Sequence, residues 1–197
     1  QRNSSASSNL KRHAAALLRS GESGGFALTE GEYAMKEFSM DTGARLRALY
    51  ESQGGVGEIF SAKVGDYLSS RPDYPEPLFD MLRTRGNLAP GASVADIGAG
   101  TGLLTRGLLR RGYQVIAIEP NDEMRHAADR LLGADPKYKS VAGSAESMPM
   151  AASAVDLVTA AQSFHWFEID KARAECLRVL RPYGQVALIW NDRTPND

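Results

Sequence analysis

The fold of this chain is decided by one nine-residue stretch, Val94-Ala95-Asp96-Ile97-Gly98-Ala99-Gly100-Thr101-Gly102. Its first half, 94–97, predicts a short buried strand, and glycines follow at alternate positions. The residues after it, 103–109, have the apolar spacing of a helix start. Glycines let the backbone approach a ligand closely, and the free N–H groups of the first helical turn point toward that ligand. The stretch therefore predicts a nucleotide-binding turn between a strand and a helix.

The residues of this turn narrow the class of nucleotide. The dinucleotide fingerprint needs a third glycine where Leu103 stands, and Leu103 is too bulky for that approach. A P-loop is excluded because no Lys-Ser or Lys-Thr pair follows the glycines. Asp96 would repel a pyrophosphate, whereas a ligand with a cationic centre and an ammonium group tolerates it. S-Adenosylmethionine has both groups. The alternative is an ordinary strand-to-helix turn that binds nothing.

The stretch 96–102 closely resembles the first motif of the class I S-adenosylmethionine-dependent methyltransferases. A second stretch, Gln162-Ser163-Phe164-His165-Trp166-Phe167, is similar to a signature of the type 11 and trans-aconitate methyltransferase-like branch. The resemblance covers about residues 59–191. It implies an α/β fold with a doubly wound, Rossmann-like sheet, S-adenosyl-L-methionine as cofactor, and methyl transfer to a small molecule.

Length and composition bound the other possibilities. The chain has 197 residues and a formal net charge of −1, which gives one moderate domain plus an appendage and no general attraction to nucleic acid or anionic membrane. No apolar run approaches about 20 residues and no secretory signal is visible, so we expect no membrane span and a cytoplasmic location. The single cysteine, Cys176, cannot form an internal disulfide, and its apolar helical face predicts core packing. Neither His13 nor His126 nor His165 has a metal-ligand spacing to it, so no metal is expected.

Strands and helices are expected to alternate along the second half of the chain. The predicted strands are 94–97, 113–118, 138–142, 155–161 and 185–190. The predicted helices are 76–85, 103–109, 122–132 and 169–180, the third capped by Asn121 or Asp122. A turn at 181–184 is expected to lead into the last strand. This alternation favours a parallel, doubly wound sheet.

The family's sheet has seven strands, so an antiparallel pair and one helix are expected to be absent at the C-terminal end. The strand 185–190 would then lie at an exposed edge, which invites pairing with another chain. We therefore predict that this strand is covered by residues outside the sequence or by a partner, for example in a homodimer.

The chain before residue 59 matches no known pattern. We predict that residues 1–58 are an extension, partly disordered, with helical segments at Leu10–Arg19 and Met35–Gln53. Residues 59–197 are predicted to be the S-adenosylmethionine-binding methyltransferase domain, incomplete at its C-terminal end.

Candidate cofactor residues follow the predicted strands, because ligands of such sheets bind at the carboxyl ends of the strands. Glu119 ends a strand about twenty residues after Gly98, where an acid accepts the ribose hydroxyls; a surface carboxylate beside a helix start is the alternative. Met124 either covers one face of adenine or packs its helix onto the sheet. The predicted cofactor-binding residues are Asp96, Gly98, Ala99, Gly100, Gly102, Glu119, Pro120, Met124, Ser144, Ala145, Glu146 and Gln162.

The residues that contact adenine are predicted from the resemblance to the methyltransferase family. Many relatives carry Asp, which accepts from the adenine amino group, where this chain has Ser144. Backbone groups of Ala145 or the side chain of Glu146 would have to replace it, and a structural acid is the alternative for Glu146.

The candidate substrate-binding residues lie in two stretches of the sequence. In the family, a segment like Tyr67…Arg71-Pro72-Asp73-Tyr74-Pro75 precedes the core and folds over the cofactor. Its prolines impose an extended lead-in, so Tyr67, Arg71 and Tyr74 either meet the methionine carboxylate or a substrate, or belong to a loop whose aromatic rings only pack.

The second stretch holds His165 and Trp166, which are assigned to the acceptor side. His165 follows a strand end among aromatic residues, so it either orients or deprotonates the acceptor, or is a structural histidine. A carboxylate acceptor needs no base, so both carboxylate and hydroxyl acceptors remain open. The alternative function is an S-adenosylmethionine-binding protein or regulatory subunit without transfer activity of its own.

Overall fold

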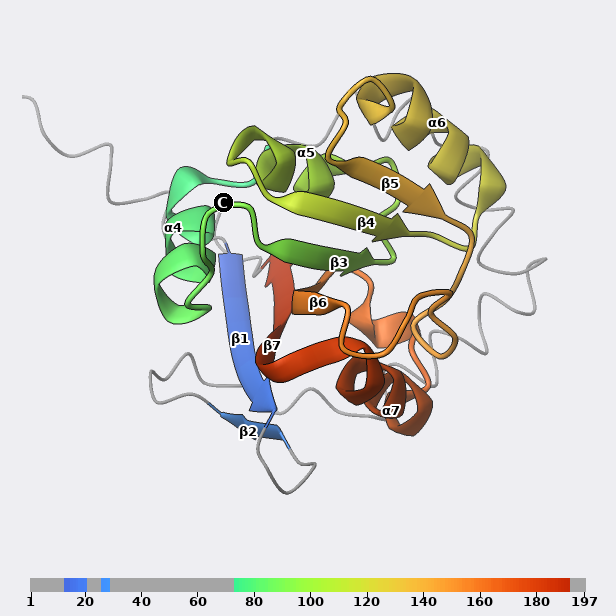
Figure 1. Cartoon of the computed structure of the whole chain (residues 1–197). Helices are drawn as coiled ribbons and strands as arrows, with labels where there is room; N and C mark the ends of the chain where they lie inside the picture. Colours follow the sequence, from blue (N-terminus) through green and yellow to red (C-terminus); the bar gives the residue numbers. More distant parts are fainter. Residues whose placement is uncertain (1–12, 21–25, 29–72, 192–197) are drawn as a thin grey trace, which may run out of the picture.

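The computed structural model describes residues 13–20, 26–28 and 73–191. Its sheet has seven strands in the order β2-β1-β7-β6-β3-β4-β5 (Figure 1). The strands are β1 (His13–Ser20), β2 (Phe26–Leu28), β3 (Ser93–Ile97), β4 (Gln114–Ile118), β5 (Tyr138–Val141), β6 (Val155–Ala161) and β7 (Leu180–Asn191). The helices are α4 (Glu76–Arg85), α5 (Leu103–Arg110), α6 (Asp122–Leu132) and α7 (Ile169–Val179), with a 3₁₀ turn η2 (Phe164–Trp166). Strands β3 to β7 pair in parallel, so the predicted doubly wound α/β fold is confirmed.

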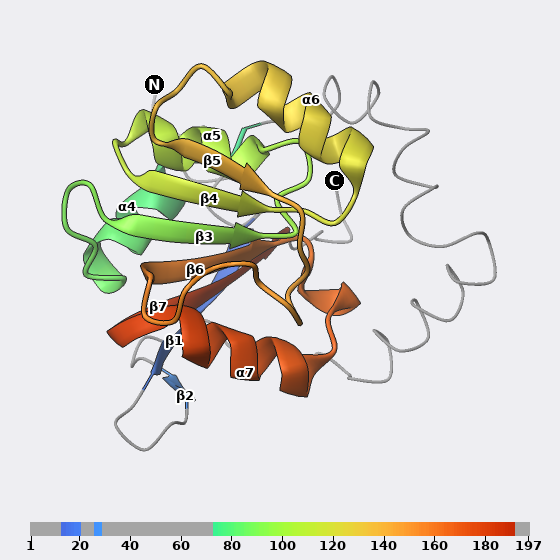
Figure 2. The ribbon, with the colours of Figure 1, turned by 45° about the vertical axis from the view of Figure 1, so that its right-hand side comes forward.

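Helices cover both faces of the sheet. Helices α4, α5 and α6 lie on one face, and α7 lies on the other (Figure 2). Side chains alternate between two cores, as the twofold period of a strand requires: Val94 and Leu157 pack with α4 and α5, whereas Ala95 and Val158 pack with α7. Both faces are therefore buried, which explains why the central strands are nearly continuous apolar runs.

The start of α4 is attached to α5. A Cβ atom on Gly107 of α5 would lie 2.1 Å from Cζ of Phe79, so only glycine lets this ring approach the helix. Directly before α4, Asp73 pairs with Arg106 and Arg110 on the same face of α5. Asp73, which lies three residues before α4, is thus fixed against the helix that follows the glycine turn.

The N-terminal segment corrects two predictions. The predicted helix at Leu10–Arg19 is wrong for the described residues, because His13–Ser20 forms β1, which pairs antiparallel with β7 along Arg19↔Gln185 to His13↔Asn191. The N–H and C=O groups on the free side of β7 form hydrogen bonds with an extended neighbour. These hydrogen bonds outweigh a local helix propensity of a few tenths of a kcal/mol per residue.

The pairing of β1 with β7 also determines which strand lies at the edge of the sheet. The prediction that β7 needs cover from outside the sequence or from a partner is wrong, since β1 of the same chain covers it and β2 pairs in turn with β1. The homodimer was predicted because β7 was expected to be an exposed edge, so this pairing removes the reason for it. The antiparallel pair expected to be absent is supplied from the N-terminal side. The predicted helix Met35–Gln53 and the boundary at residue 58 lie outside the described residues.

The predicted turn at 181–184 lies inside β7 as an irregularity. Val155 of β6 pairs with Leu180 and Leu157 pairs with Gln185, so four residues of β7 have no register partner. Tyr183 in this excursion has φ +66° and is exposed. The strand therefore begins earlier than predicted, and its regular part starts at Gln185.

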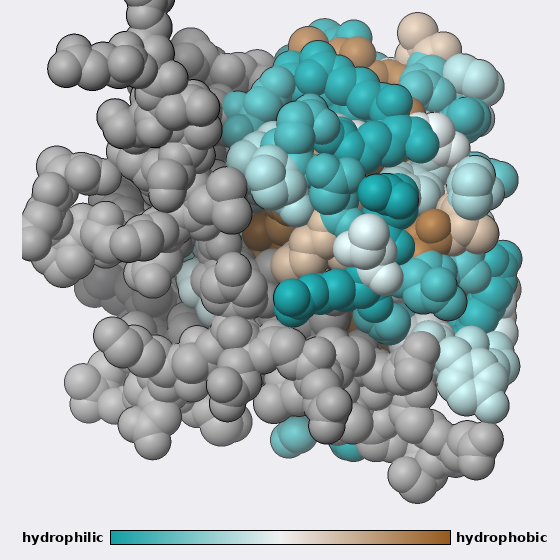
Figure 3. All heavy atoms as spheres, turned by 90° about the vertical axis from the view of Figure 1, so that its left-hand side faces the viewer, coloured by the Kyte–Doolittle hydropathy of each residue, from teal (hydrophilic) through white to brown (hydrophobic). Residues whose placement is uncertain are grey.

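Among the described residues, no helix has the length and apolar character that crossing a membrane requires. On the face drawn in Figure 3, most of the described surface is hydrophilic.

The single cysteine lies in the core. Cys176 is buried on α7, and burial raises the pKa of its thiol to about 12, so the predicted core packing is confirmed.

The pairing of β1 with β7 predicts the effect of an N-terminal deletion. A chain starting at residue 29 lacks β1 and β2, which leaves the ladder groups of β7 unpaired. We expect this chain to self-associate more than the 197-residue chain at equal concentration in sedimentation experiments. Equal sedimentation, with the amides of β7 still protected from hydrogen exchange, would contradict the pairing.

Candidate functional site

The centre of the candidate site is the turn between β3 and α5. Its three glycines all have positive φ, 64° at Gly98, 58° at Gly100 and 82° at Gly102, a conformation that favours glycine. A Cβ atom on Gly98 would lie 2.5 Å from Cβ of Ser163, and one on Gly102 would lie 2.6 Å from Cδ1 of Leu132. The turn is therefore packed tightly between the segment after β6 and helix α6.

Asp96 lies directly before this turn. Its side chain is 1% exposed; Oδ2 accepts a hydrogen bond from Thr105 Oγ1 at 2.7 Å and Oδ1 accepts one from Thr159 Oγ1 at 2.8 Å. The carboxyl thus connects β3 to α5 and to β6. Burial raises the pKa of Asp96 to about 6, although the two hydroxyls act in the opposite direction.

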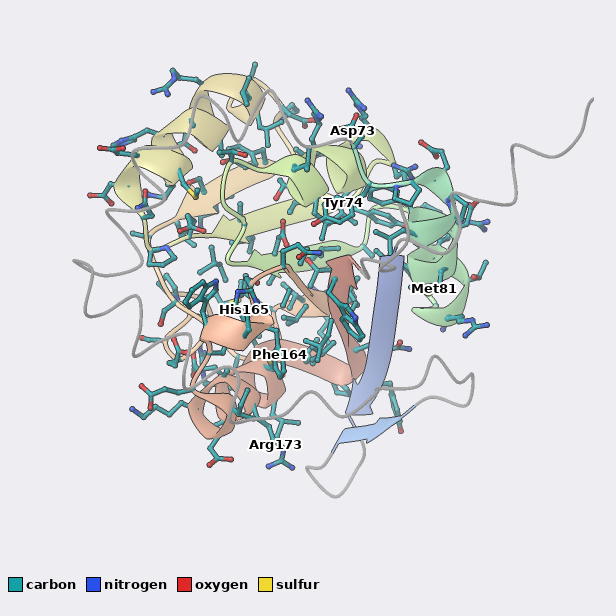
Figure 4. The ribbon with its side chains drawn as sticks, turned by 180° about the vertical axis from the view of Figure 1, so that it is seen from behind. Asp73, Tyr74, Met81, Phe164, His165 and Arg173 are labelled. Atoms are coloured by element: carbon teal, nitrogen blue, oxygen red, sulfur yellow. The ribbon has the colours of Figure 1, made fainter. Side chains whose placement is uncertain are left out.

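A small hollow of about 30 Å³ adjoins this carboxyl. It is lined by Tyr74, Asp96, Gly98, Ala99, Gly100, Thr101, Leu103, Leu104 and Ala161. Its volume is that of one small group, such as an ammonium group. Tyr74 comes from the residue stretch before α4 and also packs against the core (Figure 4). The structure therefore brings one of the predicted substrate-side residues to the glycine turn, while Tyr67 and Arg71 lie outside the described residues.

Glu119 reaches the same turn from the end of β4. It is 8% exposed; Oε2 accepts from the backbone N–H of Gly100 at 2.8 Å and Oε1 accepts from the N–H of Asn121 at 2.9 Å. Burial raises its pKa, and both N–H groups partly offset that rise. Each carboxylate oxygen retains a lone pair for another donor. The side chain is thus a buried group beside the glycines, not a surface carboxylate.

The start of α6 places a methionine, Met124, beside the glycine turn. Asn121 Oδ1 accepts from the N–H of Met124 at 2.9 Å, which confirms Asn121 as the helix cap. Met124 is 5% exposed, and its sulfur lies 3.7 Å from where a Cβ on Gly100 would stand. Pro120, which lies between Glu119 and the capping residue Asn121, is exposed.

The segment after β5 holds the predicted adenine-side residues. Ser144 and Ser147 exchange backbone hydrogen bonds of 3.3 and 3.2 Å, and Ala145 is buried. Glu146 Oε1 accepts from the backbone N–H of Glu168 at 2.8 Å, directly before α7. This contact favours the structural alternative for Glu146.

The segment after β6 is fixed by its backbone. Gln162 has φ +59°, and its N–H donates to the carbonyl of Ile189 in β7. Ser163 Oγ donates to the carbonyl of Ile97 at 2.9 Å, so the segment also contacts the end of β3. Among the described residues, Gln162 Nε2 is buried without a hydrogen-bond acceptor. A buried donor of this kind is expected to meet an acceptor oxygen.

The aromatic residues form a cluster around η2. The rings of His165 and Trp166 lie 4.7 Å apart, and those of Phe164 and Phe167 make an edge contact at 5.9 Å. Burial lowers the pKa of His165, which favours the neutral imidazole at neutral pH. Figure 4 shows His165 and Phe164 on η2, between the sheet and α7.

Three hydroxyl residues of the site were not identified from the sequence: Thr105, Thr159 and Ser163. Each bonds a residue of β3, Thr159 and Ser163 across 63 and 66 residues of the chain and Thr105 across nine. The available signal was a polar residue, Thr159, within the apolar run 157–161 of β6. Within the described ranges, no group of three or more His, Cys, Asp or Glu side chains is arranged to hold a metal.

The family model and the relatives that match this chain are all methyltransferases. Residues 95–188 match the methyltransferase domain family. An uncharacterised methyltransferase of Mycobacterium tuberculosis is 41% identical over 134 residues, 68% of this chain and 52% of that protein. The malonyl-[acyl-carrier protein] O-methyltransferase of Methylococcus capsulatus is 39% identical over 140 residues, 67% of this chain and 50% of that protein.

A solved structure agrees with these relatives. A protein of Anaeromyxobacter dehalogenans, provisionally described as a type II methyltransferase, superposes with a TM-score of 0.55 at 32% identity over 64% of this chain and 52% of that one. The chain spans about half the length of the curated relatives it matches. The narrower trans-aconitate-like branch stays a prediction.

The buried carboxyl of Asp96 predicts a pH effect on stability. Because its pKa is higher in the folded state than the ordinary value of 3.8, the folded state binds the proton more tightly. Its contribution to stability is complete below pH 4, falls as the pH rises, and is lost above pH 6. A rise from 3.8 to about 6 corresponds to about 3 kcal/mol.

We expect the free energy of unfolding of the unchanged chain, relative to Asp96→Asn, to fall by about this amount between pH 4 and pH 7. Urea titrations of both chains at several pH values measure it. Parallel pH profiles for the two chains would show that Asp96 does not titrate in this range.

Proposed function

Because residues 95–188 belong to the class I S-adenosylmethionine-dependent methyltransferases, we propose that this chain transfers a methyl group to a small-molecule acceptor that carries a carboxylate. S-Adenosylmethionine is the cofactor of this family and supplies, when bound, a methyl group activated on a sulfonium centre. The observation that carries the proposal is the glycine turn with a buried carboxyl on each side, Asp96 and Glu119.

The described residues fit this cofactor. Gly100 leaves space that a side chain would occupy, and within the described part of the chain only the Met124 sulfur lies near its Cβ position. We assign the ribose hydroxyls to the free lone pairs of Glu119, and the ammonium group to the hollow beside Asp96. Gln162 Nε2, which meets no acceptor in the described part of the chain, is assigned to the carboxylate of the cofactor's methionine part.

The adenine is assigned to the segment after β5. Ser144 replaces the Asp of many relatives, so the backbone of Ser144 and Ala145 carries this contact. Glu146 is left out of it, since its carboxylate holds the start of α7. Met124 is assigned to one face of the adenine ring.

A carboxylate acceptor suits the aromatic side of the site. A carboxylate is already a nucleophile at neutral pH and needs no base, whereas a hydroxyl acceptor needs one. A neutral His165 beside Trp166 donates a hydrogen bond to one carboxylate oxygen and so orients the other. The similarity to a malonyl-[acyl-carrier protein] O-methyltransferase supports an acidic acceptor.

The contribution of the chain to catalysis is then mainly positioning. In-line displacement at a methyl carbon depends on the alignment of acceptor, carbon and leaving sulfur, so residues that fix both ligands lower the barrier. The half-buried rings of Phe164 and Trp166 exclude water from this line. The cytoplasmic location expected from the sequence stays a prediction.

The proposal predicts acceptor-dependent product formation. Incubation with S-adenosylmethionine and a panel of small mono- and dicarboxylic acids and acyl thioesters should yield S-adenosylhomocysteine and a methyl ester, both measured by mass spectrometry. Because the acceptor needs no base, His165→Gln should lower kcat less than about tenfold.

A loss of more than about a hundredfold in His165→Gln would instead indicate base catalysis on a hydroxyl. Tight binding of S-adenosylhomocysteine with no methyl transfer to any acceptor would favour the alternative, a cofactor-binding regulatory protein.

The ribose assignment predicts a large effect of Glu119→Ala. Two hydrogen bonds to a charged acceptor contribute roughly 3–5 kcal/mol, so binding of S-adenosylhomocysteine should weaken at least about a hundredfold in calorimetric titration. Glu123→Ala is the matched control, because Glu123 is an exposed carboxylate on the first turn of α6.

Circular dichroism checks that Glu119→Ala retains its fold, since Glu119 also accepts from Gly100. A loss below about fivefold in a folded variant would remove Glu119 from the ribose site.

A further inference from the structure

Helix α7 holds the segment between β5 and β6 through one pair of side chains. Arg178 Nη1 donates to the carbonyl of Met150 at 2.7 Å, and Nη2 donates to the carbonyl of Met148 at 2.8 Å. Glu175 Oε2 accepts from the backbone N–H of Met148 at 2.7 Å. Three backbone groups of this segment are therefore bonded to two side chains of one helix.

The pair is itself rigid. Arg178 Nε lies 2.6 Å from Glu175 Oε1, and Nη2 lies 2.7 Å from Oε2, a two-point contact between residues three apart on one helix face. The hydrogen bond from Arg178 lowers the pKa of Glu175, so the carboxylate stays ionised at neutral pH. A planar guanidinium held in this way presents its remaining N–H groups in fixed directions.

Burial and a third contact complete the attachment. Ala145 and Met148 are each 3% exposed and pack in the core that includes Cys176 and other residues of α7. At the other end of the helix, Glu146 accepts from the N–H of Glu168. The segment that follows β5 therefore takes its shape from α7.

We propose that Glu175 and Arg178 are positioning residues of the cofactor site, which fix the segment 143–150 so that the backbone of Ser144 and Ala145 meets adenine. This inference rests on the proposed function. With serine at position 144, recognition of adenine depends on backbone groups, and their direction is set by the conformation of the segment. Small errors of position weaken such contacts strongly.

The same helix also carries the acceptor side. Helix α7 begins at Ile169, just after the aromatic cluster of 164–167. One rigid helix thus sets the positions of both the adenine segment and the acceptor segment. A disturbance of Arg178 is expected to reach the adenine contact first, because its bonds end on Met148 and Met150.

Arg178→Met tests the proposal, because it keeps an unbranched apolar side chain and removes all donors. We expect binding of S-adenosylhomocysteine to weaken at least about tenfold. Selectivity for this ligand over S-inosylhomocysteine, which lacks the adenine amino group, should fall by a similar factor. Arg83→Met is the matched control, since Arg83 forms an exposed pair with Asp80 at 3.5 Å on α4. It should change neither quantity.

Two conservative variants keep the test decisive if Arg178→Met folds poorly. Glu175→Gln retains an acceptor for the N–H of Met148, and Arg178→Lys retains one charge, so both should show partial losses of selectivity. Lower thermal stability with unchanged selectivity in the three variants would overturn the proposal and leave the pair a structural one. Failure of the unchanged chain to bind either ligand would contradict the proposed function itself.

Discussion

The site depends on one constraint, the burial of the Asp96 carboxyl below the glycine turn. A carboxyl that is 1% exposed would be strongly unfavourable without partners, and the hydroxyls of Thr105 and Thr159 provide them. Thr159 belongs to β6 and Thr105 to α5. The hydrogen bonds therefore require β6 to lie beside β3 and α5 to cover the same face, which is the arrangement that opens a sheet for ligand binding at the strand ends.

Around this constraint, the functional groups arrive from separate strands. Glu119 directly follows β4 and contacts the turn through Gly100, and Ser163 follows β6 and contacts the end of β3. The glycine turn, the Glu119 carboxylate and the segment after β6 are therefore linked by short contacts. Helix α7, on the other face of the sheet, holds the segment 143–150 through Arg178. The proposed cofactor and acceptor sites share one rigid frame.

Much of this frame was predictable because its signals are local. The glycine turn, the acid at the end of the next strand and the cap at Asn121 each need only a few neighbouring residues to be recognised, and the predicted helix 76–85 and strand 155–161 match the structure in their bounds. The cofactor family followed from the same local stretch.

The remainder depends on contacts that a local pattern does not contain. The segment at Leu10–Arg19 has the spacing of a helix, but its pairing partner β7 lies about 170 residues away along the chain, as in His13↔Asn191. Thr159 meets Asp96 across 63 residues, and nothing near it indicates that carboxyl. The spacing of Glu175 and Arg178 predicts an ion pair, whereas their backbone acceptors belong to another segment.

The most direct test of this cofactor site is a crystal structure of the chain with S-adenosylhomocysteine. We expect the ribose on Glu119, the adenine against Met124 and the backbone of Ser144–Ala145, and the amino-acid end at the hollow beside Asp96. Ligand density away from the glycine turn, or a ribose without contact to Glu119, would contradict this assignment.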